Sequence, residues 1–156
     1  MSQVDNKLIV ICGLPGSGKT TLAKRLAEET PAVRLCPDEW MQDLGVTLWD
    51  ETFRDKLEVR LWKLGYELLK LGQSVILEYG FWAKSERDEK LHTARLLGVG
   101  VELHYLDVPT DELQTRLGRR GMEGDDVLVE KVEEYSQRFE RPNEAELKQY
   151  DNYSRS

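Results

Sequence analysis

One short segment constrains the fold of this chain more than any other. Residues 13–20 read Gly-Leu-Pro-Gly-Ser-Gly-Lys-Thr, which fits the pattern G-x-x-x-x-G-K-[ST]. The apolar run before it, residues 7–12, predicts a strand buried on both faces. Residues 19–29 follow, with Leu22 and Leu26 one turn apart, and predict a helix. A glycine-rich loop between a buried strand and a helix turns its N–H groups inward, and such a nest binds anions.

The rest of the chain also alternates between strand and helix patterns. Further strands are predicted at residues 32–36, 74–77 and 99–108, and helices at 39–44, 51–71, 84–97, 110–119, 127–139 and just after Asn143. Right-handed crossovers then place helices on both faces of a parallel sheet. We therefore predict an α/β fold with three layers and a central parallel sheet of four or five strands. Residues 147–156 are too polar for a buried fifth strand.

Capping residues mark several helix ends. Gly72 is the predicted C′ residue of the longest helix, and Thr110 is a predicted N-cap. Asn143 is a second predicted N-cap, with Glu146 three residues later completing a capping box.

Composition narrows the class of protein. The chain has 156 residues and 33% charged residues, with no internal repeat or linker, so we expect one globular domain over residues 1–156. No apolar run reaches the roughly 18 residues that a membrane span needs, and the polar N-terminus lacks a secretory pattern. The expectation is a cytoplasmic protein in which Cys12 and Cys36, both inside apolar runs, stay as buried free thiols.

Charge is unevenly distributed along the chain. The net charge is −7, which disfavours a general nucleic-acid binder. Residues 123–146 hold nine acids against three bases, and residues 38–51 hold five acids and no base. Residues 116–120 hold three arginines and no acid. This layout predicts one anion-binding region and a separate surface that repels anions.

Two groups of residues point to phosphate chemistry. In the glycine-rich loop, Lys19 would reach β- and γ-phosphates and the Thr20 hydroxyl would bind Mg²⁺. The predicted phosphate-binding set is Gly13, Leu14, Pro15, Gly16, Ser17, Gly18, Lys19, Thr20 and Thr21. Asp38 follows the second strand, and at that edge of an open sheet its carboxylate could orient a hydroxyl and accept its proton. Alternatively, Asp38 is the N-cap of the 39–44 helix.

Taken together, these features resemble the small P-loop kinases. The shared pattern is a Walker A loop, an Asp about 20 residues later, an acid ending the third strand (Glu78), an Arg in the next helix (Arg87) and arginines near residue 120. The resemblance is to the group of zeta-toxin, chloramphenicol phosphotransferase, gluconate kinase, 5′-polynucleotide kinase and AAA_33-type ATP-binding proteins. Phe139-Glu140-Arg141-Pro142 with Glu146 is similar to the tail of the AAA_33 group, so the resemblance spans about residues 8–146.

The resemblance implies ATP and Mg²⁺ as cofactors and a role for each matching residue. Asp38 becomes the general base. Glu78 would hold the Mg²⁺ shell through water, although relatives more often carry Asp there; it could instead pair with a cation or face the acceptor. Arg87 would contact the acceptor, or else be an exposed helix residue paired with Glu86 or Asp88.

A helical lid is predicted over about residues 116–126. Arg116, Arg119 and Arg120 would bind the nucleotide phosphates there, with Arg116 and Arg120 also neutralising transition-state charge. The alternative is a solvated helix end.

Aromatic residues flank the ends of the second and third strands. Those residues are Trp40, Trp49, Tyr79, Phe81 and Trp82. They could wall an acceptor pocket, with two or three of them in the core, and we expect Trp40, Tyr79 and Phe81 to contact the acceptor. His92 and His104 lack metal-ligand spacing and are assigned to structure.

The functional expectation is an ATP-dependent kinase that phosphorylates a hydroxyl of a small molecule. Lys19, Asp38, Arg116 and Arg120 are its predicted catalytic residues. The acid-rich stretch 38–51 favours a cationic or sugar-like acceptor. The alternatives are a nucleoside, nucleotide or nucleic-acid 5′-kinase, and a nucleotide-dependent switch or ATPase that needs no acceptor. Oligomeric state and the preferred nucleobase stay open.

Overall fold

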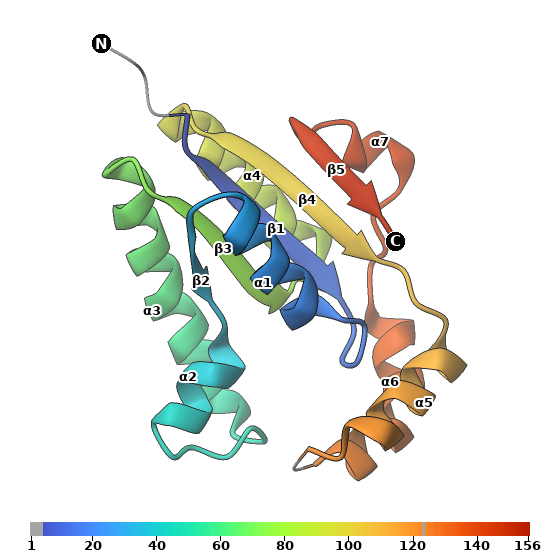
Figure 1. Ribbon diagram of the computed structural model, residues 1–156. Coiled ribbons are helices and arrows are strands. Elements are labelled where there is room, and N and C mark those ends of the chain that lie inside the picture. Colours follow the sequence, from blue (N-terminus) through green and yellow to red (C-terminus); the bar gives the residue numbers. More distant parts are fainter. Residues whose placement is uncertain (1–4, 123) are drawn as a thin grey trace.

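The computed structural model describes residues 5–122 and 124–156, and its centre is one parallel sheet (Figure 1). The strands are β1 (Lys7–Gly13), β2 (Ala32–Leu35), β3 (Ser74–Gly80), β4 (Gly100–Leu106) and β5 (Asn152–Arg155). Their order across the sheet is β2-β3-β1-β4-β5, and every neighbouring pair is parallel. The predicted α/β fold with a parallel sheet is confirmed.

Helices cover both faces of this sheet. They are α1 (Lys19–Glu29), α2 (Pro37–Asp43), α3 (Glu51–Lys70), α4 (Lys84–Leu97), α5 (Thr110–Arg120), α6 (Asp125–Arg138) and α7 (Glu144–Leu147). Figure 1 shows α1 in front of the sheet and α4 behind it. The residues of β1 alternate accordingly: Ile9 and Ile11 pack with Ala23 of α1, whereas Leu8 and Val10 pack with Leu61 of α3 and Ala94 of α4.

The capping predictions have mixed outcomes. Gly72 has a positive φ of 89° and ends α3, with its N–H donating to Leu69 O and the Gln73 N–H donating to Leu68 O, as in a Schellman motif. Asn143 caps α7 by accepting a hydrogen bond from Glu146 N. Thr110 is the first residue of α5 and not its N-cap, which is Pro109. The N-cap prediction for Thr110 was wrong: an N-cap residue precedes the first helical residue, and α5 already begins at Thr110.

The fifth strand exists, but at the edge of the sheet. Three of the four residues of β5 are exposed, so the prediction that this segment is too polar to be buried agrees with its position. A polar segment can still pair, because ladder hydrogen bonds use the backbone and an edge strand needs no second apolar face. Ser154 is held to β4 by a 2.7 Å hydrogen bond with His104 Nδ1, which gives that histidine a structural contact.

The parallel register brings the carboxyl ends of β1, β2, β3 and β4 to one edge of the sheet. Helices α2 and α5 follow β2 and β4 at this edge, and α6 packs against α5 (Figure 1). Helix α5 ends at Arg120 and α6 begins at Asp125. Glu123, which belongs to the predicted lid and acidic stretch, is outside the described residues. No helix among the described residues has the length and apolar content to cross a membrane.

Candidate active site

The glycine-rich loop is shaped by contacts that leave no room for side chains. Gly16 and Gly18 adopt positive φ angles of 83° and 98°. A Cβ on Gly13 would lie 2.6 Å from Ser17 Oγ, and one on Gly16 would lie 2.9 Å from Leu117 Cγ of α5. The loop therefore wraps closely on itself and against α5, and it leads directly into the N-terminus of α1.

Lys19 is folded back over this loop. Its Nζ donates hydrogen bonds to the carbonyl oxygens of Gly13 at 3.2 Å and Leu14 at 3.0 Å. Burial lowers the pKa of Lys19, and the nearby charge of Asp38 opposes that shift. The charge of Asp38, another of the four predicted catalytic residues, therefore favours the protonated form of Lys19.

The end of β3 is tied to the same loop. Trp82 Nε1 donates to Gly13 O at 3.3 Å, and Glu140 N donates to Trp82 O at 2.8 Å. Trp82 therefore links the glycine-rich loop, the end of β3 and the segment after α6. Phe81 beside it has a positive φ of 49°, a sparsely populated conformation for a residue with a Cβ.

Three oxygen-bearing side chains suit a magnesium ion at this edge. Glu78 Oε1 and Ser17 Oγ are buried without a hydrogen-bond partner among residues 5–122 and 124–156. Burial raises the pKa of Glu78, while Arg34 and the Thr20 hydroxyl oppose that shift. Unpartnered buried oxygens in native proteins call for an unseen water or ion, and Mg²⁺ prefers oxygen ligands and retained waters. Thr20 and Glu78 therefore fit the predicted metal role.

Arg34 of β2 is a site residue that the sequence analysis missed. Its Nε and Nη2 contact Glu78 Oε2 at 2.9 Å and 2.8 Å, and Nη2 also donates to Glu39 Oε1 at 3.0 Å. The alternative in which Glu78 pairs with a cation thus holds for Oε2, which contacts Arg34, and not for Oε1. No local signal in the sequence indicates this pair, because 44 residues separate its members.

Asp38 is the second residue of α2, and its side chain is 54% exposed. The helix begins at Pro37 and its N-cap is Cys36, so the alternative of Asp38 as the N-cap is wrong. Arg54 of α3 forms an ion pair with Asp38 Oδ1 and donates to Leu48 O at 3.0 Å through Nη2. Arg54 was also missed, and it fixes Asp38 from a helix 16 residues away.

The lid arginines have three different environments. Arg116 Nη1 donates to Ser17 O at 3.3 Å, so α5 contacts the glycine-rich loop directly. Arg120 makes a two-point contact with Asp125 at 2.9 Å and 2.5 Å and feels the charge of Asp38. Arg119 is exposed and makes no ion pair within the described part of the chain. Arg116 thus contacts the glycine-rich loop, and the hydrogen bond with Asp125, together with the charge of Asp38, raises the pKa of Arg120.

Arg87 does not lie where an acceptor could meet it. Its side chain is completely buried and pairs with Glu146 at 2.6 Å, while its remaining donors bond Phe81 O at 2.8 Å and Glu140 O at 2.7 Å. The expected acceptor contact and the alternative of an exposed pair with Glu86 or Asp88 both differ from this arrangement. Because Arg87 bonds the Glu146 carboxylate, that carboxylate does not complete the capping box predicted with Asn143.

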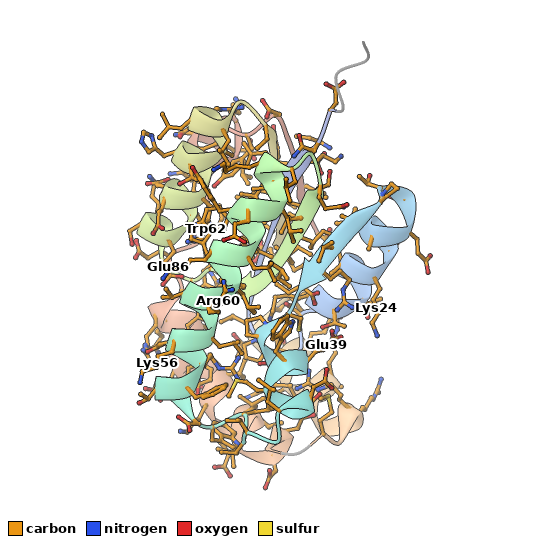
Figure 2. The ribbon with its side chains drawn as sticks, turned by 90° about the vertical axis from the view of Figure 1, so that its left-hand side faces the viewer. Lys24, Glu39, Lys56, Arg60, Trp62 and Glu86 are labelled. Carbon is orange, nitrogen blue, oxygen red and sulfur yellow. The ribbon has the colours of Figure 1, made fainter. Side chains whose placement is uncertain are left out.

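The predicted aromatic wall divides between core and surface. Phe81 is 1% exposed and stacks on Tyr79 at a ring distance of 5.1 Å, so it belongs to the core and not to an acceptor surface. The Tyr79 hydroxyl donates to Glu58 O at 2.9 Å. Trp40 is 38% exposed on α2 and stays available to an acceptor. On α3, Trp62 points toward α4, where Lys90 Nζ lies 4.8 Å from its ring (Figure 2).

Opposite charges in space offset the acid-rich stretch 38–51. Asp38 and Glu39 pair with Arg54 and Arg34, which lie outside that stretch in the sequence. Asp50 accepts a hydrogen bond from Phe53 N and caps α3. The expectation of a strongly negative potential around residues 38–51 counted only the charges within that stretch. The ion pairs with Arg34 and Arg54 reduce that potential, which weakens the expectation.

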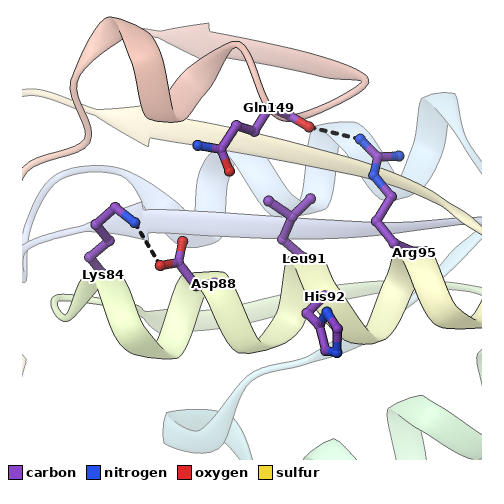
Figure 3. Close-up of a pocket in the computed structure, with 6 residues that line it drawn as sticks. All are labelled: Lys84, Asp88, Leu91, His92, Arg95 and Gln149. Carbon is purple, nitrogen blue, oxygen red and sulfur yellow. Dashed lines mark hydrogen bonds and ion pairs between the residues drawn. The ribbon is translucent and has the colours of Figure 1, made fainter.

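A groove elsewhere on the surface is not part of this site. It lies between α4 and the C-terminal segment, and Lys84, Asp88, Leu91, His92, Arg95 and Gln149 line it (Figure 3). Its charged groups already have partners: Lys84 pairs with Asp88 at 2.6 Å, and Arg95 pairs with Asp151 at 2.8 Å and donates to the backbone oxygen of Gln149 at 2.7 Å.

Comparisons with known proteins agree with this geometry. The chain is similar to a fungal RNA kinase at 20% identity and a TM-score of 0.68, covering 99% of this chain and 76% of that one. It is similar to the APS kinase CysC of Mycobacterium tuberculosis, solved with AMPPNP and APS, at 18% identity and a TM-score of 0.66, covering 97% and 88%. A chain in a Pnkp1/Rnl/Hen1 complex matches at 23% identity and a TM-score of 0.62, covering 74% of this chain and 40% of that one.

Similarity at these identities establishes the fold, and the chain spans less than half of the Pnkp1/Rnl/Hen1 chain that it matches. A comparison with curated proteins finds no match. The model of the AAA_33 family, described as an AAA domain, matches residues 8–142, which is most of the chain. The chain therefore belongs to the AAA_33 family, and its fold is that of the P-loop kinases.

Proposed function

We propose that this protein is an ATP-dependent kinase that transfers the γ-phosphoryl group to a hydroxyl of a small molecule. The observation that carries the proposal is the placement of Asp38: it follows β2 at the same edge of the parallel sheet at which the glycine-rich loop follows β1. A switch that hydrolyses nucleotide would use such a carboxylate to orient water, whereas the kinase proposal assigns Asp38 to the hydroxyl of an acceptor.

Each residue has a defined task in this reaction. The loop N–H groups and Lys19 bind the β- and γ-phosphates, and Arg116 approaches the same phosphates from α5. Thr20 and Glu78 would hold Mg²⁺, which when bound offsets phosphate charge. Asp38 orients the acceptor hydroxyl with the oxygen that Arg54 leaves free. The hydroxyl oxygen bonds to the γ-phosphorus, the bond to the β-γ bridging oxygen breaks, and the proton passes to Asp38.

The acceptor is proposed as a neutral or weakly charged hydroxyl compound such as a sugar or polyol. The ion pairs of Asp38 and Glu39 remove much of the reason for a strongly cationic acceptor. Trp40, which is 38% exposed and lies two residues after Asp38 in α2, offers an apolar surface on which the carbon side of a sugar ring could pack.

An acceptor panel with radiolabelled ATP and Mg²⁺ tests the proposal. The panel contains neutral polyols, amino sugars, sugar acids, nucleosides and an oligoribonucleotide with a 5′-hydroxyl. We expect label transfer to a small hydroxyl compound, and loss of transfer by orders of magnitude in a folded Lys19→Ala variant. ATP hydrolysis without transfer to any acceptor would favour the switch, and transfer to the oligoribonucleotide alone would favour the nucleic-acid kinase.

A further inference from the structure

The strongest unexplained feature of the site is the way Glu78 is held. Its side chain is 1% exposed, and only one of its two oxygens has a hydrogen-bond partner among the described residues. A buried carboxylate normally satisfies both oxygens, because an unmet hydrogen bond in the interior destabilises the folded state. An oxygen left in this way calls for a bound water or ion, and another group must hold the carboxylate by its other oxygen.

That group is Arg34. Its Nε donates a hydrogen bond to Oε2 at 2.9 Å and its Nη2 lies 2.8 Å from the same oxygen, so Arg34 holds Oε2 and leaves Oε1 without a hydrogen-bond partner among the described residues. The fork is itself fixed, because Nη2 also donates to Glu39 Oε1 at 3.0 Å. The guanidinium is planar and its donors have a set geometry, so these contacts determine the rotation of the Glu78 carboxylate.

Strand register places this pair beneath the start of α1. Arg34 of β2 lies opposite Ile76 of β3, and Ile76 packs with Ala23 of α1. Glu78 is two residues beyond Ile76, so it points to the same face of the sheet. Thr20 is on the first turn of α1, the helix whose Ala23 packs on this face of the sheet. The free oxygen thus belongs to the region where Thr20 would bind the metal.

We propose that Arg34 is a positioning residue for the divalent cation: it clamps Glu78 Oε2 so that Oε1 is presented, through the metal's water shell, to an ion held by Thr20 and the nucleotide. The inference rests on the proposed function, since it assumes that the site takes a metal–nucleotide complex. It adds that β2, through Arg34, links the metal-side acid to Glu39, the neighbour of Asp38 in α2.

The test measures metal binding and not turnover. Free Mn²⁺ is followed by electron paramagnetic resonance while the protein is titrated in the presence of a non-hydrolysable ATP analogue, and calorimetry follows the analogue itself. Replacing a residue that orients a metal ligand commonly weakens metal affinity by about 10- to 100-fold, and we expect a loss in this range for Arg34→Met. Arg34→Lys keeps the charge but not the fork, so we expect an intermediate loss.

Three further variants make the result specific. Arg25→Met removes an exposed arginine whose pair with Glu29 on α1 is 3.8 Å long, and it should leave Mn²⁺ affinity unchanged. Glu39→Gln loosens only the outer contact of Arg34 and should have a small effect. Glu78→Gln should match or exceed the loss in Arg34→Met. Circular dichroism confirms that each variant is folded; if Arg34→Met does not fold, Arg34→Lys carries the test.

The possible results separate the two proposals. Wild-type Mn²⁺ affinity in a folded Arg34→Lys or Arg34→Met, with a clear loss in Glu78→Gln, overturns the positioning role and leaves the kinase proposal intact. Unchanged affinity in Glu78→Gln overturns it as well, since Glu78 would then lie outside the metal shell. Failure of the wild-type protein to bind the ATP analogue overturns the proposed function first and the inference with it.

Discussion

Asp38 shows how a single functional residue depends on a distant one. Its carboxylate is 54% exposed and forms an ion pair with Arg54 of α3, at the edge of the sheet where the glycine-rich loop also lies. A base that accepts the acceptor proton typically contributes about 10²- to 10⁴-fold to the rate, so Asp38→Asn should reduce acceptor phosphorylation by this range. The exposed pair contributes only about 0–1 kcal/mol, and the melting temperature should hardly change.

Calorimetry and initial rates test this prediction with Asp43→Asn as the control. Asp43 is exposed at the other end of α2, so the control removes a carboxylate from the same helix. ATP affinity should be close to wild type in both variants. Full phosphorylation activity in Asp38→Asn would mean that Asp38 takes no proton.

Glu58 gives a second prediction at the same scale, through pH. Burial raises the pKa of Glu58 from 4.5 to about 7, with Arg54 opposing the shift. A carboxyl whose pKa is raised by folding binds a proton more tightly in the folded state, so its contribution to stability falls as pH rises from about 4.5 to 7. Glu58→Gln, which stays neutral, should therefore gain in melting temperature relative to wild type between pH 5 and pH 8.

Thermal unfolding at both pH values measures this gain, and Glu67→Gln serves as the comparison because Glu67 is exposed on the same helix. Its melting temperature should follow that of wild type at each pH. An equal offset of Glu58→Gln at both pH values would contradict the raised pKa.

At the scale of elements, the helices and strands could be predicted where local chemistry determines them. The strand–loop–helix unit follows from an apolar run, glycines that need positive φ and an amphipathic helix, all within 23 residues. The Arg87–Glu146 and Arg34–Glu78 pairs could not be predicted from the sequence, because each joins segments far apart along the chain. Both arginines pair with buried carboxylates, and no local periodicity encodes that pairing.

The link between α4 and α7 leads to a prediction about stability. Arg87 and Glu146 are both buried, with side chains 0% and 2% exposed. Removing one member of a buried pair leaves an uncompensated charge and typically costs about 3–5 kcal/mol. Arg87→Met should therefore lower the free energy of unfolding in urea by this amount, while Arg95→Met, which breaks an exposed pair with Asp151, should cost about 0–1 kcal/mol. Equal small losses would place Arg87 outside any structural role.

Helix α5 contains two arginines, Arg119 and Arg120, that the sequence analysis both assigned to the nucleotide phosphates but that have different surroundings in the structure. Arg120 neutralises Asp125, which is 3% exposed, so Arg120→Ala should lower stability by about 1.5–3 kcal/mol. Arg119 has no such partner in the described ranges, and Arg119→Ala should leave the melting temperature unchanged. Thermal unfolding and steady-state kinetics on both variants test the distinction. A lower kcat with an unchanged melting temperature in Arg119→Ala would give it a role in the closed, nucleotide-bound state.

At the scale of the whole molecule, the net charge of −7 creates a field that single contacts do not show. The ion pairs of Asp38 and Glu39 reduce the negative potential close to the proposed acceptor site. The field of the whole protein should therefore determine how charged acceptors approach. With ATP saturating, kcat/KM for a sugar acid should rise with added salt, because screening at a Debye length of about 10 Å in 0.1 M salt weakens repulsion. A neutral polyol should show no such change. For an oligonucleotide acceptor, a steep fall of kcat/KM with salt would instead indicate release of counterions from a basic groove, and would contradict the small-molecule assignment.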